Sequence, residues 1–122
     1  MIIERIKSDI RPGTIIPKPQ SAREYRVVRW GQSRGEDALV YSIPTRVSGG
    51  KASKKRIKLS DFKAAYEFLV KTGEFTYGWF KDNLPDCAKD GSCNFTTICA
   101  IFELLGEAQY GHRGAYRWPT DQ

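Results

Sequence analysis

The strongest helical pattern in the chain is SDFKAAYEFLVKTG, at residues 60–73. Its apolar side chains recur at the spacing of one helix face: Phe62, Ala65, Tyr66, Leu69 and Val70. Ser60 is a favourable N-cap, and Gly73 is a favourable residue just past a helix end. We therefore expect a helix between these two residues that buries one apolar face.

Two further helices and a β-hairpin are expected after this first helix. Thr76 can cap a short helix ending near Pro85, and Asn94 can cap a third helix ending at Gly106, with residues 85–93 as a loop between them. Residues 107–110 and 115–118 indicate two strands around a glycine-bracketed turn. This order of elements, over residues 56–118, resembles that of winged-helix domains.

The third helix lacks the side chains that read DNA bases. Its outward face is expected to consist of Thr96, Thr97, Ala100 and Glu103, which include no cation. Substituting Thr97 or Glu103 by Ala should then leave stability almost unchanged. Either the contact to nucleic acid uses the loop and hairpin instead, or this helix packs against another protein.

The amino-terminal half indicates a helical arm followed by strands. Isoleucines at helical spacing occupy residues 1–10, and prolines then favour extended backbone. Residues 24–30 and 38–43 alternate as a hairpin, with Trp30 on the face opposite Val27, and residues 56–59 suggest a third strand. We expect one α+β domain over 1–122: an arm (1–20), a β-rich basic part (24–59), and three helices plus a hairpin (60–118), with a small antiparallel sheet.

Charge is distributed unevenly along the chain. Its formal net charge is +6, but residues 1–60 contain 14 basic and 5 acidic side chains, whereas residues 61–122 contain 6 and 9. An asymmetric basic surface attracts polyanions, chiefly nucleic acid. No apolar run is long enough to span a bilayer, and the first ten residues are too charged for a signal peptide, so we expect a cytoplasmic protein without membrane contact.

A cationic segment is the sharpest feature of the basic half. Thirteen residues, 46–58, contain no acid and six cations: Arg46, Lys51, Lys54, Lys55, Arg56 and Lys58. We expect residues 45–55 to form a mobile, glycine-hinged loop that follows a phosphate backbone, the alternative being a solvated surface loop. His112, Arg113 and Arg117 on the expected hairpin can reach phosphates or a minor groove.

Catalytic and metal-binding patterns are weak. Cys87, Cys93 and Cys99 are separated by five residues each, whereas zinc ligand pairs usually have about two to four between them. Cys99 is expected in the core, and the other two as exposed thiols or loop anchors. Asp61 and Lys63 have the D-x-K form of nucleases, but they fall in the first turn of a helix and point to different faces. We expect no metal, cofactor or catalytic residue.

Aromatic residues lie beside cations in both halves of the chain, such as Tyr25, Trp30 and Tyr41 near arginines, and Tyr116 and Trp118 around Arg117. They can stack on unpaired bases, but such residues are more often half-buried in strands. The sequence therefore favours a small non-enzymatic module that contacts nucleic acid through the basic loop and hairpin. The alternative is an interaction or assembly protein, in which the apolar arm and exposed aromatics hold a second copy or another protein.

Overall fold

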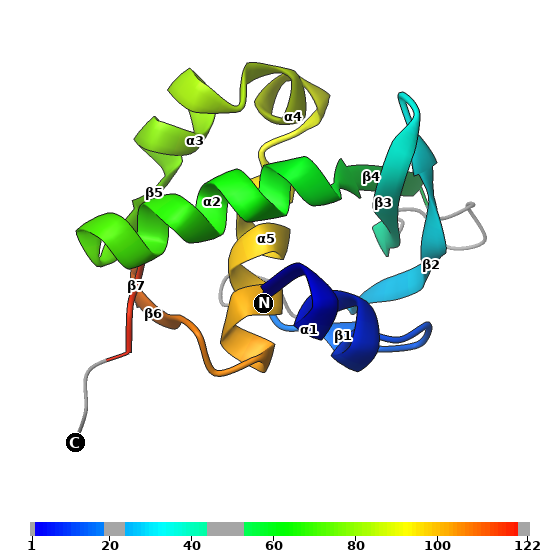
Figure 1. Ribbon diagram of the computed structural model, residues 1–122, viewed down its shortest axis with the longest axis horizontal. Coiled ribbons are helices and arrows are strands. Elements are labelled where there is room, and N and C mark those ends of the chain that lie inside the picture. Colours follow the sequence, from blue (N-terminus) through cyan, green and yellow to red (C-terminus); the bar gives the residue numbers. More distant parts are fainter. Residues whose placement is uncertain (1, 19–23, 44–52, 120–122) are drawn as a thin grey trace.

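The computed structural model describes residues 2–18, 24–43 and 53–119. Within these residues the chain forms five helices, a four-stranded antiparallel sheet and a three-stranded sheet, so the expected α+β class is confirmed (Figure 1). One hydrophobic core connects all of these parts, from Ile6 to Tyr116. No helix in the described part of the chain has both the length and the hydropathy of a membrane-spanning segment.

Helix α2 (Leu59–Thr72) forms where its periodicity predicts, with Phe62, Ala65 and Leu69 buried. Gly73 ends it with a φ of 83°, a left-handed conformation that suits glycine. Two details of the prediction are wrong. Ser60 is not the N-cap, because the helix begins one residue earlier and the Ser60 amide donates to the Glu36 carboxylate over 3.0 Å. Val70 is 51% exposed, because it lies at the margin of the apolar face.

The larger sheet has the strand order β1-β2-β3-β4. Its strands are β1 (Ile15–Ile16), β2 (Tyr25–Ser33), β3 (Glu36–Ile43) and β4 (Ser53–Lys58). The hairpin predicted between β2 and β3 is confirmed, but its loop is much shorter than expected, because both strands continue to a tight turn at Arg34 and Gly35, where φ is positive. The inner face of this sheet packs Val27, Leu39 and Ile57 into the core.

Trp30 lies on the inner face, contrary to the alternation read from the sequence. A bulge between Val27 and Arg29 inserts one residue, so that Val27 pairs with Tyr41 and Trp30 with Leu39 on the same side. The indole Nε1 then donates to the carbonyl of Ile10, 3.1 Å away. This bond fastens the sheet to the segment that follows α1 (Ile2–Asp9).

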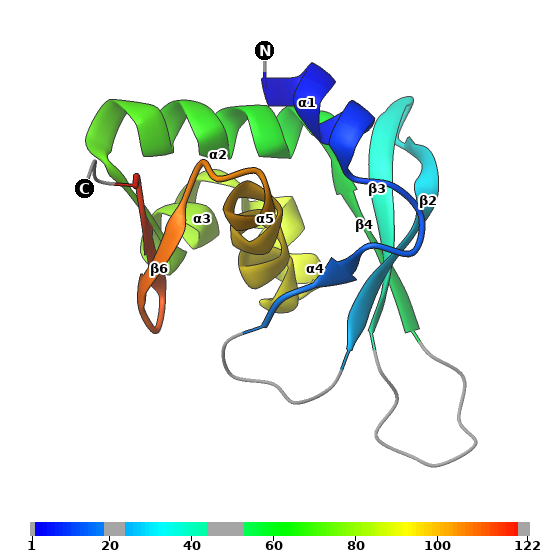
Figure 2. The same ribbon diagram turned by 90° about the horizontal axis from the view of Figure 1, so that it is seen from below.

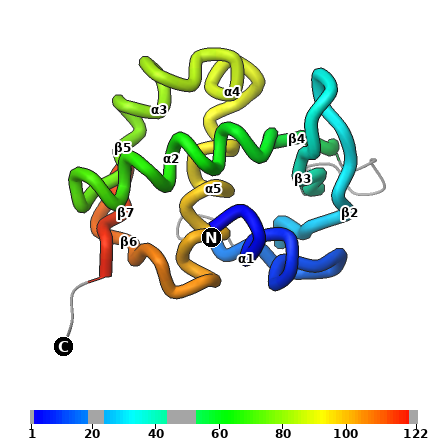
Figure 3. Tube along the Cα trace, in the orientation of Figure 1, coloured from blue at the N-terminus to red at the C-terminus, as the bar shows by residue number. Residues whose placement is uncertain are grey.

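The amino-terminal arm belongs to the core of the chain itself. Ile6 and Ile10 are buried, α1 packs against α2, and β1 packs against α5 (Figure 3). The helical spacing of the isoleucines therefore indicates a face that packs within this chain.

The remaining elements form the second half of the fold. They are β5 (Glu74–Thr76), α3 (Tyr77–Asn83), α4 (Pro85–Asp90), α5 (Cys93–Leu104), β6 (Gln109–His112) and β7 (Ala115–Arg117). Thr76 caps α3 as predicted, since its hydroxyl accepts from the Trp79 amide over 3.2 Å. The predicted hairpin is present, and β5 pairs with its second strand to give the order β5-β7-β6. The expected order of helices and hairpin therefore holds, with β5 and α4 as additions.

The interval between α3 and α5 was wrongly expected to be a loop. Residues 85–90 form α4, with Pro85 in its first turn, where the missing amide proton costs nothing. Asn94 is likewise not a helix cap. It lies inside α5, is fully buried, and accepts from the Tyr41 hydroxyl over 2.5 Å while donating to the Cys87 carbonyl over 2.9 Å.

Helix α5 is buried over most of its length, which corrects the expectation of an outward face. Thr97 and Ala100 are both fully buried, and only Thr96 and Glu103 of the expected face are partly exposed. The helix runs through the middle of the molecule, with α2, the hairpin and β1 around it (Figures 1 and 2). A helix in this position cannot enter a groove of DNA.

Candidate nucleic-acid interface

One face of the larger sheet is covered by cations, and we call it the basic sheet face. It consists of Arg26, Arg29, Lys54, Arg56 and Lys58. The strand register places them together, because Ser42 pairs with both Arg26 and Lys54, and Val40 pairs with both Arg29 and Arg56. The core residues Leu39 and Ile57 occupy the opposite face.

The long side chains of this face lie over a small apolar strip of sheet. Ala38 and Val40 point to the same side and are buried, although they do not belong to the core cluster. At Gly31 a Cβ atom would lie 2.5 Å from an Arg29 guanidinium nitrogen and 3.1 Å from Val40 Cγ2. The Arg29 guanidinium therefore lies against the backbone of Gly31, which has no side chain, and it stays exposed at the surface.

Most of these cations have no acidic partner in the part of the chain that the structure describes. Arg26 pairs with Glu24 at 2.6 Å, but within the described residues Arg29, Lys54 and Arg56 make no ion pair. The charge of Lys58 influences the Glu36 carboxylate, but within the described residues the two side chains form no ion pair. The pKa of the Glu36 carboxyl is lowered first by hydrogen bonding to Ser60 and, to a smaller extent, by the charge of Lys58. The face thus presents uncompensated positive charge at three positions.

A groove of about 610 Å³, which we call the edge groove, runs between β4 and α4. It is lined by six cations and three acids: Arg34, Lys54, Lys55, Arg56, Lys58, Lys89, Asp61, Asp86 and Asp90, together with Ser33 and Cys87. The acids are partly neutralised, because Arg34 lies 3.1 Å from Asp86, and Lys55 donates to the Asp90 carbonyl with its carboxylate 3.8 Å away. Strand β4 is the last strand of its sheet among the described residues, so its outer edge faces this groove.

Four residues of the predicted basic loop are brought together by a strand. Lys54, Lys55, Arg56 and Lys58 all belong to β4, where Lys55 turns inward toward Asp90 and the other three turn to the basic sheet face. Arg46 and Lys51 lie outside the described residues, as do residues 45–52 of the mobile loop expected over 45–55. The loop prediction is wrong for residues 53–55, because they pair with β3 as the first part of β4. The prediction missed Arg26 and Arg29, whose position two strands away becomes visible only when the register is known.

The three predicted hairpin residues are all exposed. Arg117 lies 3.4 Å from the Glu74 carboxylate, and His112 Nδ1 lies 3.1 Å from the carbonyl of Arg113. The Arg113 guanidinium has no hydrogen-bond or ion-pair partner in the described part of the chain. Figure 2 places the hairpin tip, the start of α5 and the start of β4 on the same side of the molecule, opposite α2.

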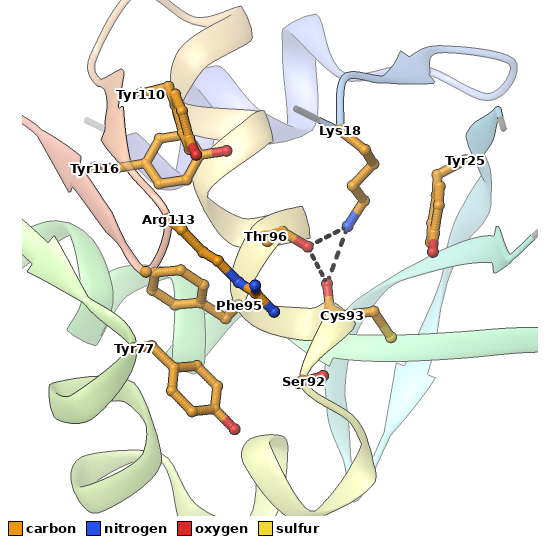
Figure 4. A pocket seen from close by; sticks show the side chains of 11 residues that line it. Lys18, Tyr25, Tyr77, Ser92, Cys93, Phe95, Thr96, Tyr110, Arg113 and Tyr116 are labelled. Atoms are coloured by element: carbon orange, nitrogen blue, oxygen red, sulfur yellow. Dashed lines mark hydrogen bonds between the residues drawn. The ribbon is translucent and has the colours of Figure 1, made fainter. Parts of the chain in front are cut away.

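A second cavity, of about 440 Å³, lies between the hairpin and the start of α5, and we call it the aromatic pocket (Figure 4). Its walls contain five aromatic residues and two cations: Tyr25, Tyr77, Phe95, Tyr110, Tyr116, Lys18 and Arg113. Ser92, Cys93, Thr96 and Gly114 complete it. None of these residues is acidic.

Lys18 is held at the wall of this pocket by α5. Its ammonium donates to the Cys93 carbonyl at 3.1 Å and to the hydroxyls of Thr96 and Thr97 at 2.6 and 2.7 Å, and it lies 4.4 Å from the centre of the Tyr25 ring. Burial lowers the pKa of this ammonium from 10.5 to about 8. Through these hydrogen bonds Lys18, which lies between β1 and β2, connects its segment to the central helix α5.

No match to a known protein was found. Comparisons with protein-family models, curated proteins and solved structures all gave none. The function must therefore be argued from the geometry of this chain.

The residues considered for metal binding or catalysis do not assemble into a site. No cluster of three His, Cys, Asp or Glu side chains suited to a metal occurs within residues 2–18, 24–43 and 53–119. Cys99 lies in the core as predicted, but Cys87 is also buried, because α4 turns it inward, and this burial raises its pKa to about 12. Asp61 is in the first turn of α2 as expected, and partial burial raises its pKa.

Proposed function

We propose that this protein is a non-enzymatic module that binds nucleic acid through the basic sheet face, the adjoining edge groove and the carboxy-terminal hairpin. The observation that carries this proposal is the set of three cations, Arg29, Lys54 and Arg56, that the register places on one face and that make no ion pair within residues 2–18, 24–43 and 53–119. Charges at fixed positions on a sheet can each release a counterion from a phosphate backbone.

The position of α5 supports contact with the phosphate backbone in preference to base reading in a groove. A helix that is buried over most of its length offers few side chains to a groove of the duplex. Of the residues expected on its outward face, only Thr96 and Glu103 are partly exposed, and neither is a cation. Lysines and arginines on a sheet surface contact phosphates without regard to sequence. We therefore expect affinity that depends strongly on salt and weakly on base sequence.

The test replaces Lys54, Arg56 and Lys58 together by Ala. Each lost phosphate contact lowers the magnitude of the slope of log K against log salt by about 0.9 for duplex DNA and about 0.7 for a single strand, so three contacts lower it by about 2.7 or about 2.1. The matched control replaces Lys63, Lys71 and Lys81 by Ala, which are exposed on α2 and α3 and change the net charge equally. Binding of a labelled oligonucleotide is titrated at several salt concentrations.

Equal slopes for the two triple variants would contradict the proposal, because net charge alone would then explain the binding. Loss of slope confined to the β4 variant supports it.

The assembly alternative has less support in this fold than in the sequence. The apolar arm that it requires is used by the core, since Ile6 and Ile10 are buried. Its remaining candidates are exposed apolar side chains such as Val70 and Trp118. Sedimentation equilibrium on the same samples tests it, because an assembly surface predicts a concentration-dependent mass without nucleic acid.

A further inference from the structure

The aromatic pocket adjoins the edge groove at the junction of α4 and α5. At Gly91, between these helices, a Cβ atom would lie 3.2 Å from the Lys55 ammonium and 3.3 Å from Cys93 Sγ. Lys55 lines the groove and Cys93 lines the pocket, so the two cavities are separated by only this short segment. A chain of phosphates along β4 would therefore pass close to the pocket.

The chemistry of the pocket suits a flat, uncharged ring attached to an anion. Aromatic side chains form much of its wall, and Tyr77 and Phe95 meet edge to face with ring centres 5.6 Å apart. Arg113 points from the hairpin into the same space (Figure 4). No acid lines the pocket, and its two cations, Lys18 and Arg113, attract an anion attached to the ring.

A buried hydroxyl in the pocket wall lacks a partner. Tyr116 is 1% exposed, and its hydroxyl is the single buried side-chain polar atom in the described residues without a hydrogen bond. Such groups are rare in folded proteins and indicate a missing partner. Because this hydroxyl is buried, a ring bound in the pocket reaches it only if neighbouring side chains move, so the argument for the pocket rests on its aromatic and cationic lining.

We propose that the aromatic pocket receives one unpaired base of a single-stranded nucleic acid. This inference rests on the proposed function, because the neighbouring phosphates are assigned to Arg113, the edge groove and the basic sheet face. Base stacking on tyrosine and phenylalanine is sequence-tolerant, and it is open only to a base that is not already stacked and paired in a duplex.

The experiment compares three labelled ligands of equal length: a single strand, the same strand with abasic sites at every position, and the matching duplex. One base stacked on an aromatic side chain contributes a factor of about 5 to 150 in affinity. We expect the base-bearing strand to bind more tightly than the abasic strand by a factor in this range, with similar salt slopes. Quenching of 2-aminopurine placed in the strand reports the stacking directly.

Tyr77→Leu tests the pocket and Trp118→Leu is its control, because Trp118 is exposed and does not line the pocket. The Tyr77 variant should remove the preference for bases and keep the affinity for the abasic strand. Equal binding of the base-bearing and abasic strands by the unmodified protein, which requires no variant to fold, would overturn the inference. In that case salt-dependent binding of the abasic strand leaves the proposed function standing, whereas no binding of any ligand overturns both.

Discussion

Lys18 should make the stability of the protein depend on pH in a direction unusual for a lysine. Its ammonium has a pKa of about 8 in the folded chain and 10.5 as its ordinary value. Between these values the unfolded chain binds more protons than the folded one, so the free energy of unfolding increases as pH rises through this window. The penalty is complete below about pH 8 and disappears above about pH 10.5. From pH 7 to pH 9 the gain is about 1 kcal/mol.

The perturbation is Lys18→Met, which keeps the length of the side chain and removes the titrating group. Urea unfolding followed by circular dichroism gives the free energy of unfolding of both proteins at about pH 7, 8 and 9. Only the difference between the two is used, because burial raises the pKa values of Cys87 and Cys99 and gives the opposite pH trend in both proteins. Lys63→Met, on the exposed face of α2, is the control.

The unmodified protein should gain stability relative to the Met variant as pH rises, and the Lys63 variant should follow the unmodified protein. Parallel curves for all three proteins would refute the reasoning, because the ammonium of Lys18 would then have its ordinary pKa in the fold.

The remaining predictions concern the core around α5. Phe102 is fully buried against Phe62 and Tyr66, so Phe102→Ala should lower the free energy of unfolding by about 3–5 kcal/mol, while Val70→Ala, at an exposed site, changes it by less than about 0.5 kcal/mol. Thr97→Ala removes a buried acceptor of Lys18 and should cost about 1–3 kcal/mol in the same urea titrations, a reversal of the near-neutral effect expected from sequence. A Thr97→Ala protein as stable as the parent would show that this hydroxyl is not needed by Lys18.

The elements that the sequence predicts well are those with local signals. Helix α2 has a complete apolar face and a glycine stop, α3 has a threonine cap, and the hairpins have turn residues between alternating strands. In each case the residues that form the element also contain the information that ends it.

The errors arise where a contact far along the chain decides the outcome. The two-residue strand β1 and the three-residue strand β5 are too short for alternation to be visible, and they form because β2 and β7 offer them partners. The bulge in β2 turns Trp30 inward, which periodicity cannot anticipate because it assumes an uninterrupted strand. The local sequence around Asn94 resembles a helix cap, yet its side chain accepts a hydrogen bond from Tyr41 in β3 of the larger sheet.

The candidate site divides in the same way. Runs of cations are visible in sequence, so Lys54, Arg56 and Lys58 could be selected directly. Arg29 could not, because its place beside Arg56 follows from a register in which Val40 lies between them. From sequence the aromatic pocket could be anticipated only as tyrosines that lie near cations, because its lining residues come from five separate stretches of the chain: residues 18, 25, 77, 92–96 and 110–116.

In our proposal the contact with nucleic acid falls on strands and turns, because most of α5 is buried. A winged-helix order of elements would make the third helix the reader, but here a sheet from the amino-terminal half and Lys18 cover the side of that helix that would otherwise face outward. The same sheet also presents an outer face that does not belong to the core and that carries Arg29, Lys54 and Arg56. This is the surface that our proposal assigns to nucleic acid in place of the helix. The amino-terminal segment therefore removes helix-in-groove recognition and supplies the cations on which our proposal of backbone binding rests.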